Sequence, residues 1–278
     1  MTYDAADNSA KCYALAIKTM RDKLNSLPAE QLRQHFMPET MRDKLNSFRR
    51  EQIGDCTLYL GDCRELLPLL PKVDAVVTDP PYGIGHRRGK AGNRGKGVSL
   101  GAGNIANDDE PFDPAAFVRF PCILWGGNHF ASELPRGRWL IWDKTLGAGS
   151  GDFSEFEVAW CSSVGADRIY RHMWMGVQRD SEVGQERLHP TQKPVELMRW
   201  CVEWFPAART ILDPYMGSGT TGVACVKLGR KFIGIEIDPG YFETACRRIR
   251  EAYSQPDMFL EQAKAPKPEQ LDMLGAAE

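Results

Sequence analysis

One segment of the chain limits the possible folds more than any other, because it joins a strand, a tight turn and a helix start in a fixed order. Residues 209–220 read RTILDPYMGSGT, in which a short apolar strand ends at Asp213 and a G-x-G turn follows. The next predicted strand, Phe232–Glu236, also ends in an acid. A unit of this kind connects neighbouring parallel strands. Ligands of open parallel sheets bind where the strands end in such turns.

From Asp55 onward, short apolar runs alternate with helical patterns, which predicts an α/β fold with a mostly parallel sheet. The predicted strands are Thr57–Leu60, Asp74–Thr78, Cys122–Trp125, Trp139–Trp142, Phe156–Cys161, Thr210–Leu212 and Phe232–Glu236. The predicted helices are Arg64–Leu70, Pro194–Trp204, Thr220–Leu228 and one that starts near Pro239.

Three regions are predicted along the chain. Residues 1–52 form a small helical module, because residues 10 to about 50 are rich in Leu, Lys, Arg and Gln. The octapeptide TMRDKLNS occurs there twice, at Thr19–Ser26 and Thr40–Ser47. A recent duplication without function explains this repeat, and a module that aids dimerisation or DNA contact is the functional alternative. Residues 53–253 form the main domain, and residues 254–278, rich in Pro, Gln, Lys and Ala, form a flexible tail.

Charge and apolar content exclude several classes of protein. The net charge is only −2, although the segment from His86 to Lys96 is basic and contains no acid, so that it could contact phosphates. No run of about 18 apolar residues predicts a membrane span, and the acidic, polar start lacks the parts of a signal peptide. A cytoplasmic location is therefore expected. The scattered cysteines form no C-x-x-C pair, so neither a metal site nor a disulfide framework is expected.

The glycine turn favours a ligand that carries adenosine and an amino acid. The turn lacks the full G-x-G-x-x-G fingerprint, and the chain has no G-x-x-x-x-G-K-[ST] loop, so a pyrophosphate is disfavoured. Glycines let a ligand approach the backbone closely. Glu236 could accept the two hydroxyls of a ribose. Asp213 could accept an ammonium group.

A second motif, Asp79-Pro80-Pro81-Tyr82, follows the apolar strand at residues 75–78. The two prolines fix the backbone and remove two amide donors, which leaves carbonyl oxygens and one carboxylate at the strand end. Such an acceptor surface suits an –NH2 group on a flat ring. Asp79 and the Pro80 carbonyl could accept the two amine hydrogens while Tyr82 stacks on the ring. A rigid strand-to-loop turn without chemistry is the alternative interpretation.

Together, the motifs DPPYG and LDPYMGSGTTG resemble those of the DNA amino-methyltransferases, which methylate adenine N6 or cytosine N4. The catalytic tetrapeptide comes before the cofactor turn, an order that resembles the circularly permuted β group of that family. Further segments are similar to the family over roughly residues 55–250, namely Gly61–Cys63, Leu124–Asn128, Trp142–Lys144 and His189–Pro194.

The resemblance implies a Rossmann-like, S-adenosyl-L-methionine-dependent methyltransferase that flips its target base out of duplex DNA. It implies an amine pocket at Asp79, Pro80, Pro81 and Tyr82. It also implies a set of residues that hold S-adenosylmethionine, which are Asp62, Lys193, Asp213, Gly217, Gly219, Thr220 and Glu236. The chain has Tyr215 where many relatives have Phe, and this ring is expected to pack similarly.

Double-stranded DNA is the expected partner, and two basic regions are the expected contacts. One is the loop after the catalytic turn, with Arg87, Arg88, Arg94 and Lys96. The other is the target-recognition region of the resemblance, about residues 145–188, with Arg168, Arg171 and Arg179. Arginine can read base edges, or it can contact only phosphates. So short a recognition region favours a homodimer.

Several alternatives remain at this point. Cytosine C5 methylation needs a cysteine nucleophile, but Cys122 begins a predicted strand and is interpreted as a core residue. Cytosine N4 methylation uses the same pocket, although Asp at the first catalytic position favours adenine in the family. An RNA methyltransferase or a non-catalytic DNA-binding protein is disfavoured by the motif order and by the intact motifs. No nuclease-like cluster is present, which favours an orphan or modification-only enzyme of a bacterium or phage, close to the nucleoid.

Overall fold

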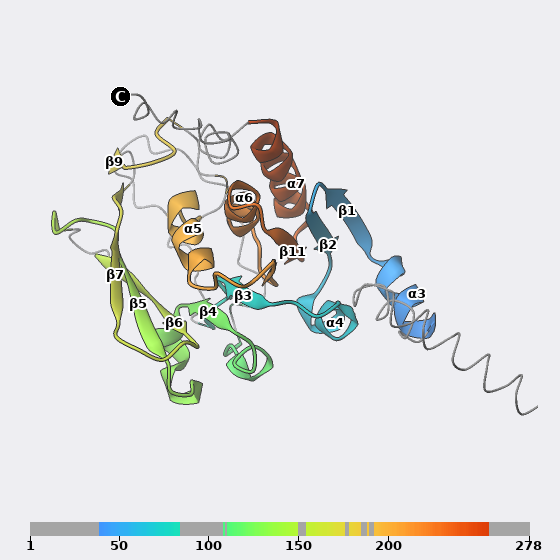
Figure 1. The fold of residues 1–278 in the computed structure, drawn as a ribbon, viewed down its shortest axis with the longest axis horizontal. Coiled ribbons are helices and arrows are strands. Elements are labelled where there is room, and N and C mark those ends of the chain that lie inside the picture. Colours follow the sequence, from blue (N-terminus) through green and yellow to red (C-terminus); the bar gives the residue numbers. More distant parts are fainter. Residues whose placement is uncertain are drawn as a thin grey trace, which may run out of the picture.

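One nine-stranded sheet forms the centre of the part of the chain that the computed structural model describes, which is residues 39–83, 108, 110–149, 154–175, 178–184, 188 and 192–255. The strand order in the sheet is β1-β2-β11-β10-β3-β4-β6-β5-β7, and β8 and β9 pair separately (Figure 1). The strands are β1 (Arg49–Ile53), β2 (Cys56–Leu60), β3 (Ala75–Thr78), β4 (Cys122–Trp125), β5 (Arg138–Asp143), β6 (Phe156–Cys161), β7 (Arg168–Arg171), β8 (Trp174–Met175), β9 (Gln178–Arg179), β10 (Thr210–Asp213) and β11 (Lys231–Glu236).

The five central strands run parallel in the order β2-β11-β10-β3-β4. Strand β1 is antiparallel to β2 at one edge, and β6 is antiparallel to both β4 and β5. Strand β11 follows β10 in the chain and lies next to it in the direction of β1, whereas β4 follows β3 and lies next to it in the direction of β7. The strand order therefore reverses between β10 and β3, which is where open α/β sheets bind their ligands. The predicted α/β fold with a mostly parallel sheet is confirmed.

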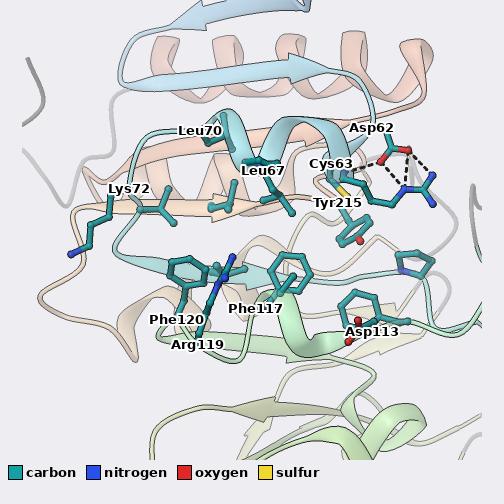
Figure 2. A pocket seen from close by; sticks show the side chains of 18 of the residues that line it. Asp62, Cys63, Leu67, Leu70, Lys72, Asp113, Phe117, Arg119, Phe120 and Tyr215 are labelled. Carbon is teal, nitrogen blue, oxygen red and sulfur yellow. Dashed lines mark hydrogen bonds and ion pairs between the residues drawn. The ribbon is translucent and has the colours of Figure 1, made fainter. Parts of the chain in front are cut away.

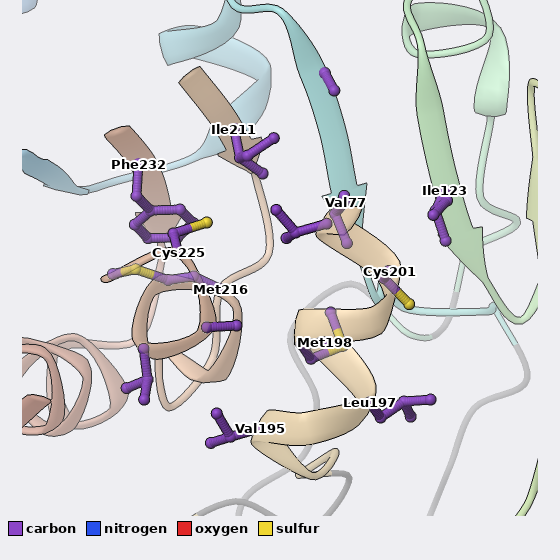
Figure 3. Close-up of a cluster of buried hydrophobic side chains, with 14 of the residues drawn as sticks. Val77, Ile123, Val195, Leu197, Met198, Cys201, Ile211, Met216, Cys225 and Phe232 are labelled. Atoms are coloured by element: carbon purple, nitrogen blue, oxygen red, sulfur yellow. The ribbon is translucent and has the colours of Figure 1, made fainter. Parts of the chain in front are cut away.

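Helices cover both faces of this sheet because alternate strand residues point to opposite sides. On one side lie α5 (Val195–Glu203), α6 (Thr220–Lys227) and α7 (Pro239–Ser254). They bury Val77, Ile123, Ile211 and Phe232, together with Met198 of α5, in one apolar cluster (Figure 3). On the other side lie α4 (Cys63–Leu66) and the 3-10 turns η1 (Leu67–Leu69), η2 (Pro114–Ala116) and η3 (Gly127–Glu133).

The described elements agree with most of the predicted ones, with differences near the start of the domain. The helical pattern expected to run to about residue 50 ends in α3 (Glu39–Ser47). The next residues form β1, which pairs with β2 through a turn in which Gly54 has a φ of +54°. Strand β1 thus spans the boundary predicted between residues 52 and 53. The helix predicted at Arg64–Leu70 is shorter because Pro68 lacks an amide hydrogen, and a 3-10 turn follows α4.

The region predicted for target recognition, residues 145–188, is not a separate unit. Strands β6 and β7 lie within it and belong to the central sheet. Ala159, Trp160 and Cys161 of β6 are buried because β6 lies between β4 and β5. Membership of the sheet does not bury all of this region, because Arg168 and Arg171 of β7 are exposed. The first octapeptide copy and residues 256–278 of the predicted tail lie outside the described residues.

Candidate active site

The two predicted motifs meet at the ends of adjacent parallel strands. Asp213 ends β10, and Thr78 ends the neighbouring β3 directly before Asp79. The Thr78 hydroxyl donates a hydrogen bond of 2.6 Å to Asp213 Oδ1. Two segments 135 residues apart in the sequence are thus joined at one point of the sheet. The predicted cofactor turn and the predicted catalytic turn therefore form one site.

Asp213 is the buried centre of this junction, with only 3% of its surface exposed. Its Oδ2 accepts a hydrogen bond of 2.6 Å from the Thr221 hydroxyl of α6, and its Oδ1 also accepts one from the Tyr215 amide. Burial raises the pKa of Asp213 to about 6, although these donors oppose the rise. Both oxygens of the predicted ammonium acceptor are therefore engaged by the chain itself.

Glu236, at the end of β11, holds the glycine turn through its side chain. Its Oε2 accepts from the Gly217 amide at 2.9 Å, and its Oε1 accepts from the Asp238 amide at 2.8 Å. The residue is 9% exposed, and burial raises its pKa to about 7. Within the described part of the chain, no cation lies at ion-pair distance from this carboxylate. Each carboxylate oxygen has a second lone pair that a hydroxyl could still use.

The other predicted cofactor residues have structural partners. Gly219 adopts a φ of +80° before α6, and a side chain there would have its Cβ 2.8 Å from the Cβ of Ala245 in α7. Conformation and helix packing thus explain this glycine without a ligand. The Thr220 hydroxyl accepts from Arg248 at 3.0 Å. Asp62 accepts from the Arg64 amide at the start of α4 and forms an ion pair of 2.6 Å with the Arg64 side chain, which lowers the pKa of Asp62.

The predicted catalytic turn, residues 79–82, places Asp79 beside an aromatic ring and a buried cation. The Tyr82 hydroxyl donates to Asp79 Oδ1, and the Lys193 ammonium lies 2.5 Å from Asp79 Oδ2. Burial raises the pKa of Asp79, and the charge of Lys193 opposes this rise. In the sequence, Pro80 and Pro81 separate Asp79 from Tyr82.

Tyr82 is fixed from three directions. Its amide and the Gly83 amide both donate to Asp108 Oδ1, at 2.9 and 3.1 Å. Its ring stacks on the ring of His129, with centroids 5.0 Å apart and planes inclined by 17°. Gly126, with a φ of +71°, lies so close that a Cβ there would overlap the Tyr82 ring. Of these three contacts, Gly126 belongs to the segment Leu124–Asn128 that the sequence singled out, whereas Asp108 and His129 lie outside it.

The contacts of Lys193 are with two carboxylates of the chain itself, Asp79 and Glu157. Only 5% of the residue is exposed, and its ammonium contacts Asp79 and Glu157 and lies 5.1 Å from the centre of the Trp125 ring. The sequence predicted a cofactor contact for Lys193 and gave no role to Glu157. An acid within the apolar strand FEVAWC was the available signal, because charges are rarely buried without a partner.

A pocket of about 760 Å³ lies on the sheet face covered by α4 and η1. Figure 2 shows Asp62, Cys63 and Tyr215 at one end and Lys72 at the other, with Leu67 and Phe117 on opposite sides. Pro81 of the catalytic turn also lines it. The pocket therefore connects the catalytic turn with the segment that follows β2.

Three of the predicted DNA contacts can be placed. Arg168 and Arg171 lie at the two ends of β7, the last strand of the sheet, and both are exposed. Arg171 lies 3.8 Å from Asp143, and the Arg179 guanidinium lies over the ring of Trp174. The remaining predicted contacts lie outside the described residues, namely Arg87, Arg88, Arg94 and Lys96.

Three further predictions concern a core cysteine, a metal site and a membrane-spanning helix. Cys122 is fully buried in β4, and burial raises the pKa of its thiol to about 12, as expected for a core cysteine. Among the described residues, no group of three or more His, Cys, Asp or Glu side chains could hold a metal ion. No helix in that part of the chain is both long and apolar enough to span a bilayer.

Comparisons with known proteins point to one family. Residues 138–247, which include Asp213 and Glu236, match the N6_N4_Mtase family model, described as DNA methylase. The type II methyltransferase M.HinfI of Haemophilus influenzae is 25% identical over an alignment of 258 positions, which covers 72% of this chain and 70% of that protein. The type II methyltransferase M2.LlaDCHI of Lactococcus lactis subsp. cremoris is 38% identical over an alignment of 86 positions, which covers 29% of this chain and 30% of that protein.

Among solved structures, the M1.HpyAVI–SAM complex aligns with a TM-score of 0.45 at 22% identity, covering 69% of this chain and 99% of that one. The cytosine-N4-specific PvuII DNA methyltransferase aligns with a TM-score of 0.43 at 15% identity, covering 73% of this chain and 93% of that one. The matched family model spans the glycine turn, and the two curated relatives named above are type II methyltransferases. The chain is thus similar to DNA methylases of the N6/N4 family over residues 138–247.

Proposed function

We propose that this protein methylates the N6 amine of adenine in double-stranded DNA and takes the methyl group from S-adenosylmethionine. The observation that carries the proposal is the junction of the two turns, in which Thr78 and Asp213 join through a hydrogen bond of 2.6 Å. It sets the amine-accepting carboxylate of Asp79 beside the cofactor turn, as a transfer between two bound molecules requires.

The residues around the glycine turn fit the proposed cofactor. Glu236 is a buried carboxylate held by two backbone amides and by no described cation, so it could accept the ribose hydroxyls. The Gly217 amide positions this carboxylate. Asp213 accepts from the Tyr215 amide at the start of the turn, and the Thr220 hydroxyl at its end accepts from Arg248. The pocket end at Asp62 and Tyr215 would take the adenine. When bound, S-adenosylmethionine supplies a methyl group carried on a positively charged sulfur.

The catalytic turn would act on the amine. Asp79 Oδ1 and the Pro80 carbonyl would accept its two hydrogens, which draws the nitrogen lone pair out of conjugation with the ring. In the present structure, Asp79 Oδ1 accepts a hydrogen bond from the Tyr82 hydroxyl. The target amine would therefore replace this hydroxyl as the hydrogen-bond donor to Asp79 Oδ1. Tyr82 would stack on the flipped base and offset part of the unstacking cost. Asp79 could then hold the proton that the nitrogen loses.

Adenine is proposed over cytosine N4 because an aspartate occupies the first catalytic position. The contacts of Asp79 with Lys193 and Tyr82 suit an acceptor for either exocyclic amine, so the choice of base depends on the motif. Arg168, Arg171 and Arg179 are proposed DNA contacts. A homodimer is also proposed, since two strands of the recognition region belong to the sheet. Gel filtration that shows a strict monomer both free and on DNA would contradict the dimer.

The test is expression in bacteria that lack their own DNA methylation, followed by sequencing of the native DNA for modified bases. N6-methyladenine at one defined motif is the expected result, and Asp79→Ala should abolish it while retaining cofactor binding. Methylation at cytosine N4 would keep the mechanism and overturn the choice of base. Unmodified DNA from a cell with abundant folded, cofactor-binding protein would reject the proposal in favour of an RNA substrate or a non-catalytic role.

A further inference from the structure

Four charged side chains form a continuous ladder that ends at the proposed catalytic carboxylate. The Lys144 ammonium lies 3.0 Å from Glu157 Oε1, and the Lys193 ammonium lies 3.3 Å from Glu157 Oε2. The same Lys193 ammonium lies 2.5 Å from Asp79 Oδ2. The signs alternate along the ladder and cancel, which is how charges become tolerable when they are largely removed from water.

The four members come from four separate places in the fold. Lys144 follows β5, Glu157 is the second residue of β6, Lys193 lies just before α5, and Asp79 follows β3. The Trp125 ring of β4 lies beneath the Lys193 ammonium. Lys193 is the least exposed member, and it is shared by the two carboxylates. Its position is therefore set as much by Glu157 as by Asp79.

Sharing has a chemical consequence for Asp79. A carboxylate that keeps an ammonium to itself is a weak acceptor, because the ion pair neutralises its charge. A second carboxylate on the same ammonium draws part of that charge away. The oxygen of Asp79 that faces Tyr82 then remains a stronger acceptor for an amine hydrogen.

We propose that Glu157 is a positioning residue for methyl transfer, which acts through Lys193 to fix Asp79 and to strengthen its acceptor oxygen. The inference rests on the proposed function and deepens it. Glu157 touches neither the target amine nor the cofactor in this account. Lys193 likewise acts on the reaction through Asp79.

The electrostatics of the ladder agree with this role. Burial raises the pKa of Asp79, Lys193 lowers it, and Glu157 raises it again. Burial alone would lower the pKa of Lys193, but its two carboxylate partners raise it overall. Lys193 and Lys144 in turn lower the pKa of Glu157 against the effect of burial.

The other titratable groups near Asp79 are present unchanged in every variant that is compared. They are Tyr82 on the same turn, Asp213 at the end of β10, Asp108 beneath the Tyr82 amide and His129 stacked on Tyr82. Glu236 titrates near neutral pH and affects cofactor binding, so its contribution must be removed. Saturating cofactor and single-turnover conditions achieve this, because they report the transfer step alone.

The experiment measures the single-turnover rate of methyl transfer to DNA as a function of pH. It compares the wild type with variants at Glu157 and at its other partner, Lys144. Glu157→Gln leaves Lys193 to Asp79 alone, so the acidic limb should move to lower pH by roughly one unit. The rate at high pH should fall by up to about tenfold, as Asp79 becomes a weaker base. Lys144→Met frees Glu157 to draw Lys193 from Asp79, so its acidic limb should move in the opposite direction.

Controls separate this effect from a loss of structure. Glu155→Gln removes an exposed carboxylate two residues before Glu157 and should leave the profile unchanged. Glu157→Asp keeps the charge and should restore part of the wild-type profile. Cofactor affinity and melting temperature are measured for each variant. A purely structural role for Glu157 would lower the rate and the melting temperature without moving the acidic limb.

A second readout does not depend on activity. Carbon-13 NMR of labelled aspartate, with Asp79→Asn to assign the signal, follows the titration of Asp79 directly. An active wild type whose acidic limb and Asp79 titration are both unmoved by Glu157→Gln would overturn the inference. A wild type that transfers no methyl group would instead reject the proposed function, and with it the role of Glu157 in transfer, while the titration would still show whether the ladder links the two carboxylates.

Discussion

Cofactor binding should weaken as the pH falls through neutrality, because a proton competes for Glu236. Its buried carboxylate has a pKa of about 7, and ribose hydroxyls donate to the ionised form. The ionised fraction is about three quarters at pH 7.5 and about one tenth at pH 6. The dissociation constant for S-adenosylmethionine should therefore rise by about eightfold between these two pH values. Asp213, with a pKa of about 6, is about half protonated at pH 6, so any contribution it makes to binding would add up to about a further twofold over this range.

Isothermal titration calorimetry gives these constants for the wild type and for Glu236→Gln. The variant should bind roughly 10- to 100-fold more weakly at pH 7.5, since it loses hydrogen bonds to a charged group. It should also show little change with pH. The amino group of the cofactor also begins to lose its proton toward pH 7.5, and adenosine, which lacks this group, separates that effect from the effect of Glu236.

A matched control is Glu251→Gln, an exposed position on α7, which should retain the wild-type slope. Adenosine provides a ligand control, because it carries the ribose without the amino acid and should show the same pH dependence. Equal affinity of the wild type at pH 6 and pH 7.5 would refute the reasoning. So would a variant at Glu236 that keeps the wild-type slope.

Three further variants or labels test the site. Gly126→Ala should slow methyl transfer at least tenfold with cofactor affinity retained, because its Cβ would displace the Tyr82 ring and its φ of +71° disfavours a side chain; an unchanged rate would contradict the placement of the ring. Thr221→Val should lower the free energy of unfolding in urea at pH 8 by about 1–3 kcal/mol, since the buried Asp213 carboxylate loses a donor, and equal stability would contradict this. Mass-spectrometric mapping after iodoacetamide treatment should find Cys122 unmodified in the native protein, with modification only after unfolding.

The sequence predicted the parts of the site that depend on local pattern. Asp213, Glu236 and Asp79 each follow an apolar run, so their position at strand ends followed from the pattern alone. Parallel strands place such ends on one edge of the sheet, and the structure confirms that arrangement. The glycine turn was predictable for the same reason, although Gly219 is also required by its packing against Ala245.

The contacts between distant segments were not predictable. Lys193, Glu157 and Asp79 are far apart in the chain, and nothing in their local patterns shows that one ammonium serves two carboxylates. The edge strand β1 was missed because its sequence RREQI buries only Ile53 and reads as a continuation of a charged helix. The place of β6 in the central sheet depends on strand order, which a single sequence does not show.

The neighbour relations in the sheet also determine when the site can form during synthesis. Strands β2 and β3 leave the ribosome early, but β2 pairs with β11, and β3 pairs with β10, well over 100 residues later. At roughly 5 to 20 residues per second, the delay is roughly 7 to 27 seconds for β3 and β10, and longer for β2 and β11. Throughout it, Val76 and Val77 lack the strand that will cover their edge, and Thr78 lacks its acceptor. The nascent chain therefore depends on its last third to close the sheet, and slow, non-local pairing of this kind gives chaperones a long window in which to bind.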